Sequence, residues 1–388
     1  MAAALDTAAA AIESSRDALI ALSEAIHGFA ELGFEEVASA AAAADLLEGA
    51  GFSVTRGVCD LPTAFDARFG SGDLVVALMA EYDALPEVGH ACGHNLIATS
   101  SIGAGLGLAA VADELGLEVR VLGTPSEESG GGKALMLERG GFDGVAAAMM
   151  VHPWSLERLH SSCLAVSQLD VAFAGRTAHA SAAPWEGVNA GDAMVVSQVA
   201  IGLLRQQLPP GCQVHGIVTE GGQAANIIPG STAGKFMARA RSIEDLEALV
   251  PRVVACFEAG ALATGAVLTV SQTAPAYTHL VQDPDLLAAY RRHAEARGRT
   301  FDDDDAGLPA PTYSTDMANI SLAIPSIHPL IKIETAGAVN HQPEFAAACL
   351  GPSAETALFD GAICLAGVAI DAATTESIRS RLIASRLH

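Results

Sequence analysis

Residues 89–95, GHACGHN, form the densest cluster of possible metal ligands in this sequence. In an extended segment, residues two apart face the same side, so Cys92 and His94 can address one centre. Gly93 between them leaves room for a close approach of the backbone. A thiolate and an imidazole suit zinc and can also serve manganese, cobalt or nickel. A buried cysteine beside a hydrogen-bonded histidine in a turn would explain the same residues, so the pair alone does not establish a metal site.

A second group with chemical potential is the carboxylate pair Glu127 and Glu128, which precedes three glycines. Two neighbouring carboxylates repel each other unless a cation or a shared proton intervenes. A division of labour removes the conflict: one carboxylate binds a metal, and the other takes the proton of an attacking water. A solvated acidic loop is the simpler alternative for such a pair.

Three further residues complete a donor set for metal ions: Asp83, His152 and His341. With the two groups above, the inventory is one cysteine, three histidines, two glutamates and one aspartate. Each histidine alone would more often be structural. Together the set suits two metals that share a bridging ligand and have ordinary coordination numbers. The residues therefore favour a metal centre over separate structural roles.

The elements that must position these groups are short apolar runs of strand length. Leu74–Met79 leads into AEYDALP, Glu118–Leu122 into GTPSEESGGG, and Val145–Val151 into HPW. Near-continuous apolar strands that alternate with helices indicate a parallel sheet covered on both faces. Ligands of open α/β sheets bind outside the carboxyl ends of the strands, so these motifs should converge on one crevice.

Residues 164–273 have a different pattern, which indicates an inserted domain. Val166–Ala174 alternates with period two, and the order of expected elements is β-α-β-β-α-β, the ferredoxin-like arrangement. We therefore expect a discontinuous catalytic metal-binding domain at 1–163 and 274–388, with an α+β lid or dimerisation domain at 164–273. The main expected helices outside the insertion lie near residues 3–28, 36–50, 95–114, 132–139, 283–297 and 354–371.

Composition excludes several classes of protein. The 388 residues include 21 Lys and Arg against 45 Asp and Glu, a net charge of −24. Such a field repels nucleic acids and anionic lipid surfaces. The N-terminus lacks a basic segment followed by an apolar one, so we expect no secretory signal. Seven scattered cysteines are typical of reduced thiols, which predicts a cytoplasmic protein.

Taken together, the motifs resemble one known family. AEYDALP, GHACGHN, PSEE, VH, TAHAS, GGQAANIIP and NHQPEF occur in the order and spacing of the dinuclear metallopeptidases and amidohydrolases. That family includes carboxypeptidase G, aminoacylase and the indole-acetyl-amino-acid hydrolases. The resemblance runs from residues 27–36 to beyond His341 and is strongest to the aminobenzoyl-glutamate hydrolase and β-alanyl dipeptidase-like branch. It implies a peptidase-like αβα sandwich. Asn95 and Glu81 depart from the commonest family residues, although both fit this branch.

The resemblance also implies a role for each matching residue. Cys92 would bridge two divalent ions per subunit, Zn²⁺ or Mn²⁺ (Co²⁺ or Ni²⁺ in vitro), and the other implied ligands are His94, Glu128, His152 and His341. Glu127 would be the general base, and Asp83 would orient a ligand. In the insertion, the implied substrate contacts are His179, Asn226 and Arg239. The counterpart of His179 often reaches the partner subunit, which implies a homodimer formed through the insertion.

The predicted function is therefore metal-dependent hydrolysis of an N-acyl amino acid or dipeptide that carries a free carboxylate. The planar guanidinium of Arg239 is suited to hold that carboxylate, although a surface salt bridge would also explain it. One alternative is a hydrolase that uses Cys92 as nucleophile and His94 as base, which leaves the glutamate pair unexplained. Another is a metal-containing protein that binds acyl amino acids or peptides without cleaving them.

Overall fold

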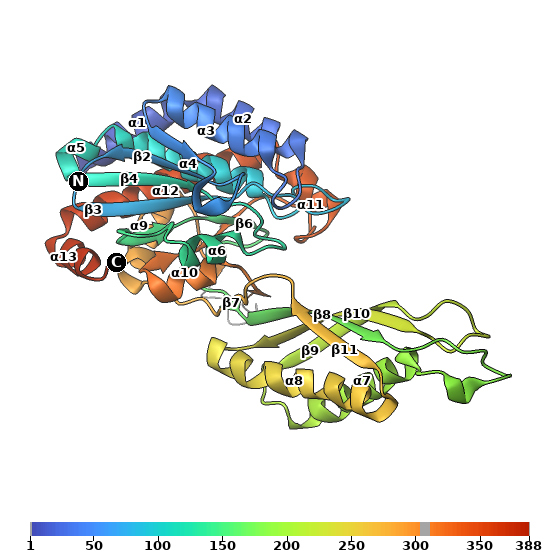
Figure 1. Cartoon of the computed structure of the whole chain (residues 1–388). Coiled ribbons are helices and arrows are strands. Elements are labelled where there is room, and N and C mark those ends of the chain that lie inside the picture. The colour runs from blue at the N-terminus through green and yellow to red at the C-terminus, as the bar shows by residue number, and fades with distance from the viewer. Residues whose placement is uncertain (1, 303–310, 388) are drawn as a thin grey trace. The chain divides into compact units, whose positions relative to one another are not determined.

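The three apolar runs are neighbouring parallel strands in the computed structural model, which describes residues 2–302 and 311–387. They are β3 (Leu74–Ala80), β4 (Leu117–Gly123) and β5 (Ala147–Met149). The sheet that contains them has the order β1-β2-β4-β3-β5-β13 (Figure 1). Only β2 (Phe65–Gly70) runs opposite to the other strands, so its pairings with β4 and with the edge strand β1 (Ser53–Arg56) are antiparallel, whereas the remaining pairings are parallel. The expected mostly parallel α/β sheet is confirmed.

The chain divides into two compact units. Unit 1 comprises residues 1–162 and 280–388, and unit 2 comprises Cys163–His279. Unit 2 thus starts one residue before the expected insertion and ends six residues after it. Residues 274–279 fall in unit 2 because the strand-like segment at Tyr277 pairs through its backbone with Val166.

Unit 1 contains helices on both faces of its sheet. The elements not yet named are α1 (Ala2–Ser14), α2 (Arg16–Phe29), α3 (Val37–Gly49), η1 (Val58–Asp60), α4 (His94–Ala109), α5 (Ala112–Leu115), α6 (Gly132–Glu138), β6 (His152–Trp154), α9 (Pro284–Ala296), β12 (Thr312–Tyr313), α10 (Met317–Ala323), β13 (Ser326–Ile327), β14 (Leu330–Lys332), α11 (Pro343–Ala348), α12 (Pro352–Thr374) and α13 (Glu376–Ala384). The single helix expected at 3–28 is wrong, because the chain breaks at Ser15 into α1 and α2.

Alternate residues of β3 explain why helices cover both faces. Val76 and Leu78 belong to the core cluster formed with α1, α2, α4, α9 and α12. Ala77 and Met79 point the other way and join the cluster formed with α6 and α10. Every residue of β3 except Val75 is therefore buried, as a strand in the middle of a three-layer sandwich requires.

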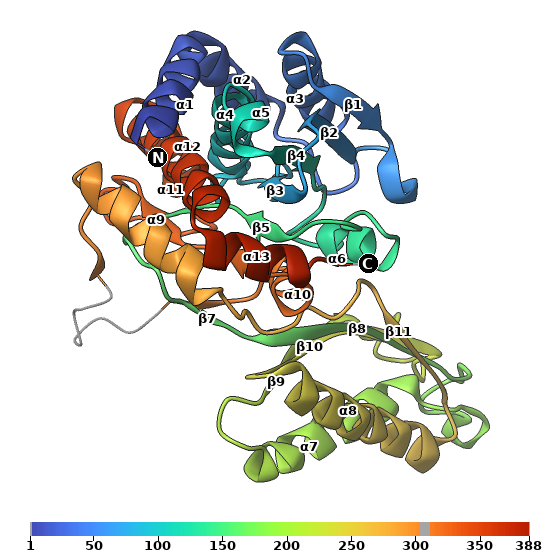
Figure 2. The ribbon, with the colours of Figure 1, turned by 90° about the vertical axis from the view of Figure 1, so that its left-hand side faces the viewer.

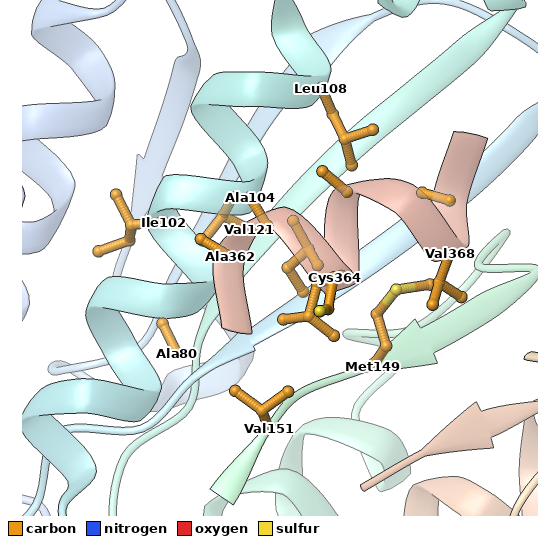
Figure 3. Packing of buried hydrophobic residues seen from close by; sticks show 14 of the residues in the cluster. Ala80, Ile102, Ala104, Leu108, Val121, Met149, Val151, Ala362, Cys364 and Val368 are labelled. Atoms are coloured by element: carbon orange, nitrogen blue, oxygen red, sulfur yellow. The ribbon is translucent and has the colours of Figure 1, made fainter. Parts of the chain in front are cut away.

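Helix α12 packs along α4 in the larger of these clusters (Figure 3). Ala104 of α4 lies beside Ala362 of α12, and the small side chains of this contact allow the two helices to approach closely. Among the described residues, α12 alone is long and apolar enough to cross a membrane. Its most apolar window is 89% buried within the protein, which is typical of a core helix.

Unit 2 has the expected β-α-β-β-α-β order. Its four-stranded sheet is antiparallel throughout, with the strand order β11-β8-β10-β9 of a ferredoxin-like domain. Its two long helices pack on one face of the sheet (Figure 2). The elements are β7 (Ser162–Cys163, at the unit boundary), β8 (Ala165–Ala174), η2 (Pro184–Glu186), α7 (Ala190–Leu204), η3 (Arg205–Gln207), β9 (Gln213–Glu220), β10 (Ser231–Ala240), α8 (Ile243–Thr264) and β11 (Val267–Gln272).

Candidate metal centre and active site

The carboxyl ends of β3 and β4 bring the predicted acidic groups together in unit 1. Asp83 lies three residues beyond the end of β3, and Glu127 and Glu128 lie four and five residues beyond the end of β4. The two loops are joined directly, because the Glu128 amide donates a hydrogen bond of 3.0 Å to Asp83 Oδ2. The convergence expected from the parallel sheet therefore occurs at these two strand ends.

His94 is the first residue of α4 and is oriented by Asp83. Gly93 precedes it with φ of +75°, a left-handed conformation that favours glycine at the start of this helix. His94 Nδ1 lies 2.9 Å from Asp83 Oδ1 and 2.8 Å from the Asp83 carbonyl oxygen. Both oxygens can only accept, so Nδ1 carries the proton. The lone pair of neutral His94 is therefore on Nε2, the arrangement common in metal-ligating histidines.

The Nε2 atom of His94 is buried and has no hydrogen-bond partner among the described residues. It lies 4.0 Å from Glu127 Oε2 and 3.9 Å from Glu128 Oε1. These three residues each place a donor atom within 4.8 Å of the others. Burial alone would lower the pKa of His94, but the charge and hydrogen bond of Asp83, with the charges of Glu81 and Glu128, together outweigh it and raise that pKa well above its usual value. The surroundings thus favour positive charge at this point.

Glu127 has the environment of a proton carrier. Burial raises its pKa well above the usual value for a glutamate, and the charges of Glu128 and Glu81 raise it further. Glu128, in contrast, keeps its Oε1 atom buried and without a hydrogen-bond partner among the described residues. The two adjacent carboxylates therefore differ in their surroundings, as the predicted division of labour requires.

Cys92, Glu128 and His341 form a second group whose donor atoms all lie within 4.8 Å of one another. His341 Nε2 is 3.9 Å from Glu128 Oε2. The His341 backbone has a φ of +71°, and its amide donates to the Ala91 carbonyl next to Cys92. Burial raises the pKa of the Cys92 thiol well above its usual value, and Glu128 raises it further. Without a cation this thiol stays protonated, which disfavours the cysteine-nucleophile alternative.

His152 lies outside both groups, although its ring is near His94. The two ring centroids are 6.1 Å apart with nearly perpendicular planes. His152 Nδ1 lies 2.8 Å from the Pro153 carbonyl, so Nδ1 is the donor and the lone pair is on Nε2. Burial lowers the pKa of His152 to about 4, and positive charge on His94 contributes. His152 is thus held as a neutral imidazole, the form that binds metals.

Comparison with known proteins identifies the family. The model of peptidase family M20/M25/M40 matches residues 77–358. The chain belongs to this family. It is 37% identical to the Xaa-Arg dipeptidase of Mus musculus over 379 residues, which cover 94% of this chain and 88% of the mouse protein. It is 34% identical to one of the chains of the p-aminobenzoyl-glutamate hydrolase of Escherichia coli, over 66% of this chain and 57% of that protein.

Solved structures agree on the fold. A dinuclear metal binding peptidase of the M20 family from Bacillus subtilis superposes with a TM-score of 0.67 at 21% identity. The match covers 92% of this chain and 98% of that one. The family and its named relatives make this M20 protein a hydrolase of the peptidase and amidohydrolase type, and they imply divalent metal ions.

The described residues of this M20 protein fit such ions. Two buried atoms that favour a cation, His94 Nε2 and Glu128 Oε1, accept no hydrogen bond among the described residues and lie 3.9 Å apart. Buried polar atoms without partners are costly, and a shared cation would satisfy both. The donor set of sulfur, nitrogen and carboxylate oxygen is one that Zn²⁺ and Mn²⁺ accept.

The predicted substrate contacts all lie in unit 2. His179 and Asn226 are neighbours, because the His179 backbone pairs with that of Ile227 in an isolated bridge and the Ala180 amide donates to the Asn226 carbonyl. His179 Nδ1 accepts from the amides of Ser181 and Ala182, so a neutral ring carries its proton on Nε2. Arg239 lies on β10, opposite Gln213 of β9, and its Nη2 donates to Met237 Sδ. Burial lowers the pKa of Arg239.

Sequence reasoning missed three charged residues beside the predicted metal ligands of this M20 protein. Lys133 is fully buried, with its Nζ atom 2.5 Å from Glu81 Oε1 and 2.6 Å from Asp316 Oδ1. Glu81 is the second residue of the AEYDALP motif and Lys133 directly follows GTPSEESGGG, so the two lie in or next to motifs already singled out. Asp316 has no such signal, because it comes from the start of α10, far along the chain.

Proposed function

We propose that this protein is a divalent-metal-dependent hydrolase that cleaves the amide bond of a dipeptide or an N-acyl amino acid with a free carboxylate. The observation that carries the proposal is the pair of adjacent glutamates in different environments beside His94. The named relatives support the substrate class, since one is a dipeptidase and the other a hydrolase of aminobenzoyl-glutamate.

Five residues would hold two cations, which we propose to be Zn²⁺ or Mn²⁺: Cys92, His94, Glu128, His152 and His341. The two three-residue groups share Glu128, which supports a centre with neighbouring ions. When bound, such ions lower the pKa of water toward 7 and polarise the scissile carbonyl. Asp83 fixes the tautomer of His94 and leaves Nε2 available.

Glu127 would move the proton. Its raised pKa places proton uptake nearer to neutral pH than for an ordinary glutamate. Glu127 would take a proton from the attacking water and then give it to the nitrogen of the leaving amine. One carboxyl group can carry out both proton transfers, and Glu127 is a carboxylate again when the amine has left.

The residues of unit 2 would recognise the substrate. The Nε2–H group of His179 is a donor that suits the oxyanion of a tetrahedral intermediate. The planar guanidinium of Arg239 suits a carboxylate, because it offers parallel N–H groups. The amide of Asn226, exposed on the segment that pairs with that of His179, would position the amide being cleaved.

We also propose that the protein is a homodimer formed through unit 2. Val195, Val199 and Leu203 lie four residues apart on α7 and are all exposed, which places an apolar row on one side of the helix. Strand β9 is at the edge of its sheet, and its Ile217 is 63% exposed. An unpaired edge strand with exposed apolar residues is suited to pair with a second copy.

A cytoplasmic location is proposed for this enzyme as well. All seven cysteines have free thiols in the structure, as expected in a reducing compartment. Fractionation of the native host cell with a tagged chain would test this, and recovery from the secreted fraction would contradict it.

The decisive test of the function is the Glu127→Gln variant, assayed on acyl amino acids and dipeptides after loading with Zn²⁺ or Mn²⁺. We expect kcat to fall by roughly 10²–10⁴-fold, the usual contribution of a general base, while two cations per subunit remain bound. Glu118→Gln, at the opposite end of β4, is the matched control and should leave kcat unchanged. Near-normal turnover of Glu127→Gln would overturn the assignment.

A further inference from the structure

The carboxylate of Glu81 is placed beside the predicted metal ligands but has no role in the function proposed above. Its side chain is completely buried. Neither of its oxygen atoms has a hydrogen-bond partner among the described residues, although Oε1 is ion-paired to Lys133 and Oε2 is not part of that pair. A buried carboxylate oxygen without a partner is costly, so this oxygen calls for a positively charged neighbour.

The Oε2 atom of Glu81 lies 3.6 Å from His94 Nε2. This is closer to Nε2 than the oxygens of Glu127 and Glu128 are, at 4.0 and 3.9 Å. Ligand bonds of about 2.0–2.2 Å place two atoms of one cation no more than about 4.4 Å apart. A single cation can therefore contact both His94 Nε2 and Glu81 Oε2 without a change of fold.

Lys133 and Asp316 hold Glu81 in this position. Lys133 Nζ contacts Glu81 Oε1 and Asp316 Oδ1, and the Lys133 backbone amide donates to Asp316 Oδ2 at 2.8 Å. All three side chains are buried, so neither acid can turn toward solvent. Burial alone would lower the pKa of Lys133, but Asp316 and Glu81 outweigh it and raise that pKa above its usual value. Lys133 is therefore a permanent cation that fixes one oxygen of Glu81 and leaves the other directed to His94.

We propose that Glu81 is a further ligand of the cation held by His94, and that Lys133 and Asp316 are its positioning residues. This rests on the proposed function, in which unit 1 binds divalent cations. The cation held by His94 then gains a further carboxylate oxygen, a ligand that suits Mn²⁺.

The test measures cation binding rather than turnover. Full-length protein is stripped with a chelator and titrated with Mn²⁺ or Zn²⁺ by calorimetry, and the Co²⁺-loaded form is followed by its visible spectrum. In Glu81→Gln we expect one site to bind Mn²⁺ at least tenfold more weakly, the other to be unchanged, and the preference of the weakened site to shift toward Zn²⁺. The Co²⁺ bands of one site should change, because an oxygen ligand is lost.

Asp66→Asn is the matched control, since Asp66 is also a buried acid of unit 1 with basic partners, but those partners are Arg120 and Arg68. Its affinities and Co²⁺ spectrum should equal those of the wild type. Lys133→Met provides a second variant. Without Lys133 to hold Glu81 in place, Mn²⁺ should bind more weakly at the same site and at no other. This variant carries the test if Glu81→Gln does not fold.

The outcomes separate the two proposals. If the wild type binds two cations and folded Glu81→Gln binds both with unchanged affinity and an unchanged Co²⁺ spectrum, Glu81 only balances the charge of Lys133 and the inference is overturned. Unchanged Mn²⁺ affinity in Lys133→Met, where Glu81→Gln is unfolded, overturns it equally. If the wild type itself binds no divalent cation, the proposed function fails, and this inference fails with it.

Discussion

Two clusters of buried charge in unit 1 differ in how completely their atoms are paired. In the first, Arg120 of β4 donates to both oxygens of Asp66 on β2, at 3.2 and 2.6 Å, and Arg68 adds a bond of 2.7 Å. Arg120 also donates to the carbonyls of Asp143 and Gly141. The second cluster contains Lys133, Glu81, His94 and the glutamate pair, and it leaves several buried atoms without hydrogen-bond partners among the described residues.

The difference separates a structural charge cluster from a ligand site. A buried ion pair is tolerated when each lone pair and each proton has a partner, as at Asp66. Where acids outnumber bases and buried atoms lack partners, the folded chain is complete only with an added cation. Both clusters bury charge. They differ in whether the buried polar atoms have hydrogen-bond partners.

Removal of divalent ions should have the largest effect on activity, because the second cluster is the one that depends on a cation. Chelation should reduce amide hydrolysis by at least about 10³-fold, because the water and the carbonyl lose their activation, and added Zn²⁺ or Mn²⁺ should restore it. Initial rates with and without the chelator measure this effect. Full activity in metal-free protein would contradict the assignment of the second cluster.

The next largest effect is on stability, in the variants Arg120→Met and Lys133→Met. Each leaves a buried acid without its base, which costs about 3–5 kcal/mol of unfolding free energy. For Lys133→Met, the loss should be larger with Mn²⁺ than without it, because the cation stabilises the wild type more than a variant that binds it more weakly. For Arg120→Met, urea unfolding should give the same loss with and without Mn²⁺. Equal cation dependence in both variants would contradict the distinction.

A smaller effect is expected from Asp83→Asn. The amide keeps the size of the side chain but loses the charge that orients His94, so cation affinity should fall roughly 10–100-fold. Calorimetric titration with Zn²⁺ measures this. Asp66→Asn should leave the same affinity unchanged, and a matching loss there would show that the effect is not local to the metal centre.

The smallest effect concerns Glu36, a buried acid whose hydrogen bonds come from neutral groups, the Thr63 hydroxyl and the Ser126 amide. Burial, with the charge of Asp83, raises its pKa to about 7. The folded state then holds more protons than the unfolded state above pH 4.5. Stability should therefore fall by about 1 kcal/mol between pH 6 and 7.5. Urea midpoints measure this fall, and Glu36→Gln should remove the contribution.

Much of the fold and most of the site could be predicted because their signals are local. The apolar runs of β3 and β4 and the acids that follow them are contiguous in sequence, and a parallel sheet brings such strand ends together. Strands β1 and β2 carried no comparable signal, because they are short and only partly buried. The break at Ser15 between α1 and α2 was also missed, since both helices have the same helix-forming residues on either side.

The part that could not be predicted depends on tertiary contact. Asp316 joins Lys133 across 183 residues of sequence, and neither residue has a spacing that connects it to the other. Glu81 was noted only as a departure from the usual family residue. That its second oxygen lies near His94 follows from side-chain geometry, which no sequence pattern contains.

The packing of α12 on α4 has a consequence for the order in which the chain folds. The two helices are separated by all of unit 2, so α4 is synthesised long before its main apolar neighbour. Unit 2 contains its own core and can fold on the ribosome as soon as it emerges. The first half of unit 1 must meanwhile wait with an apolar helix uncovered. Newly made chains should therefore be most prone to aggregation, and most dependent on chaperones, until α12 leaves the ribosome.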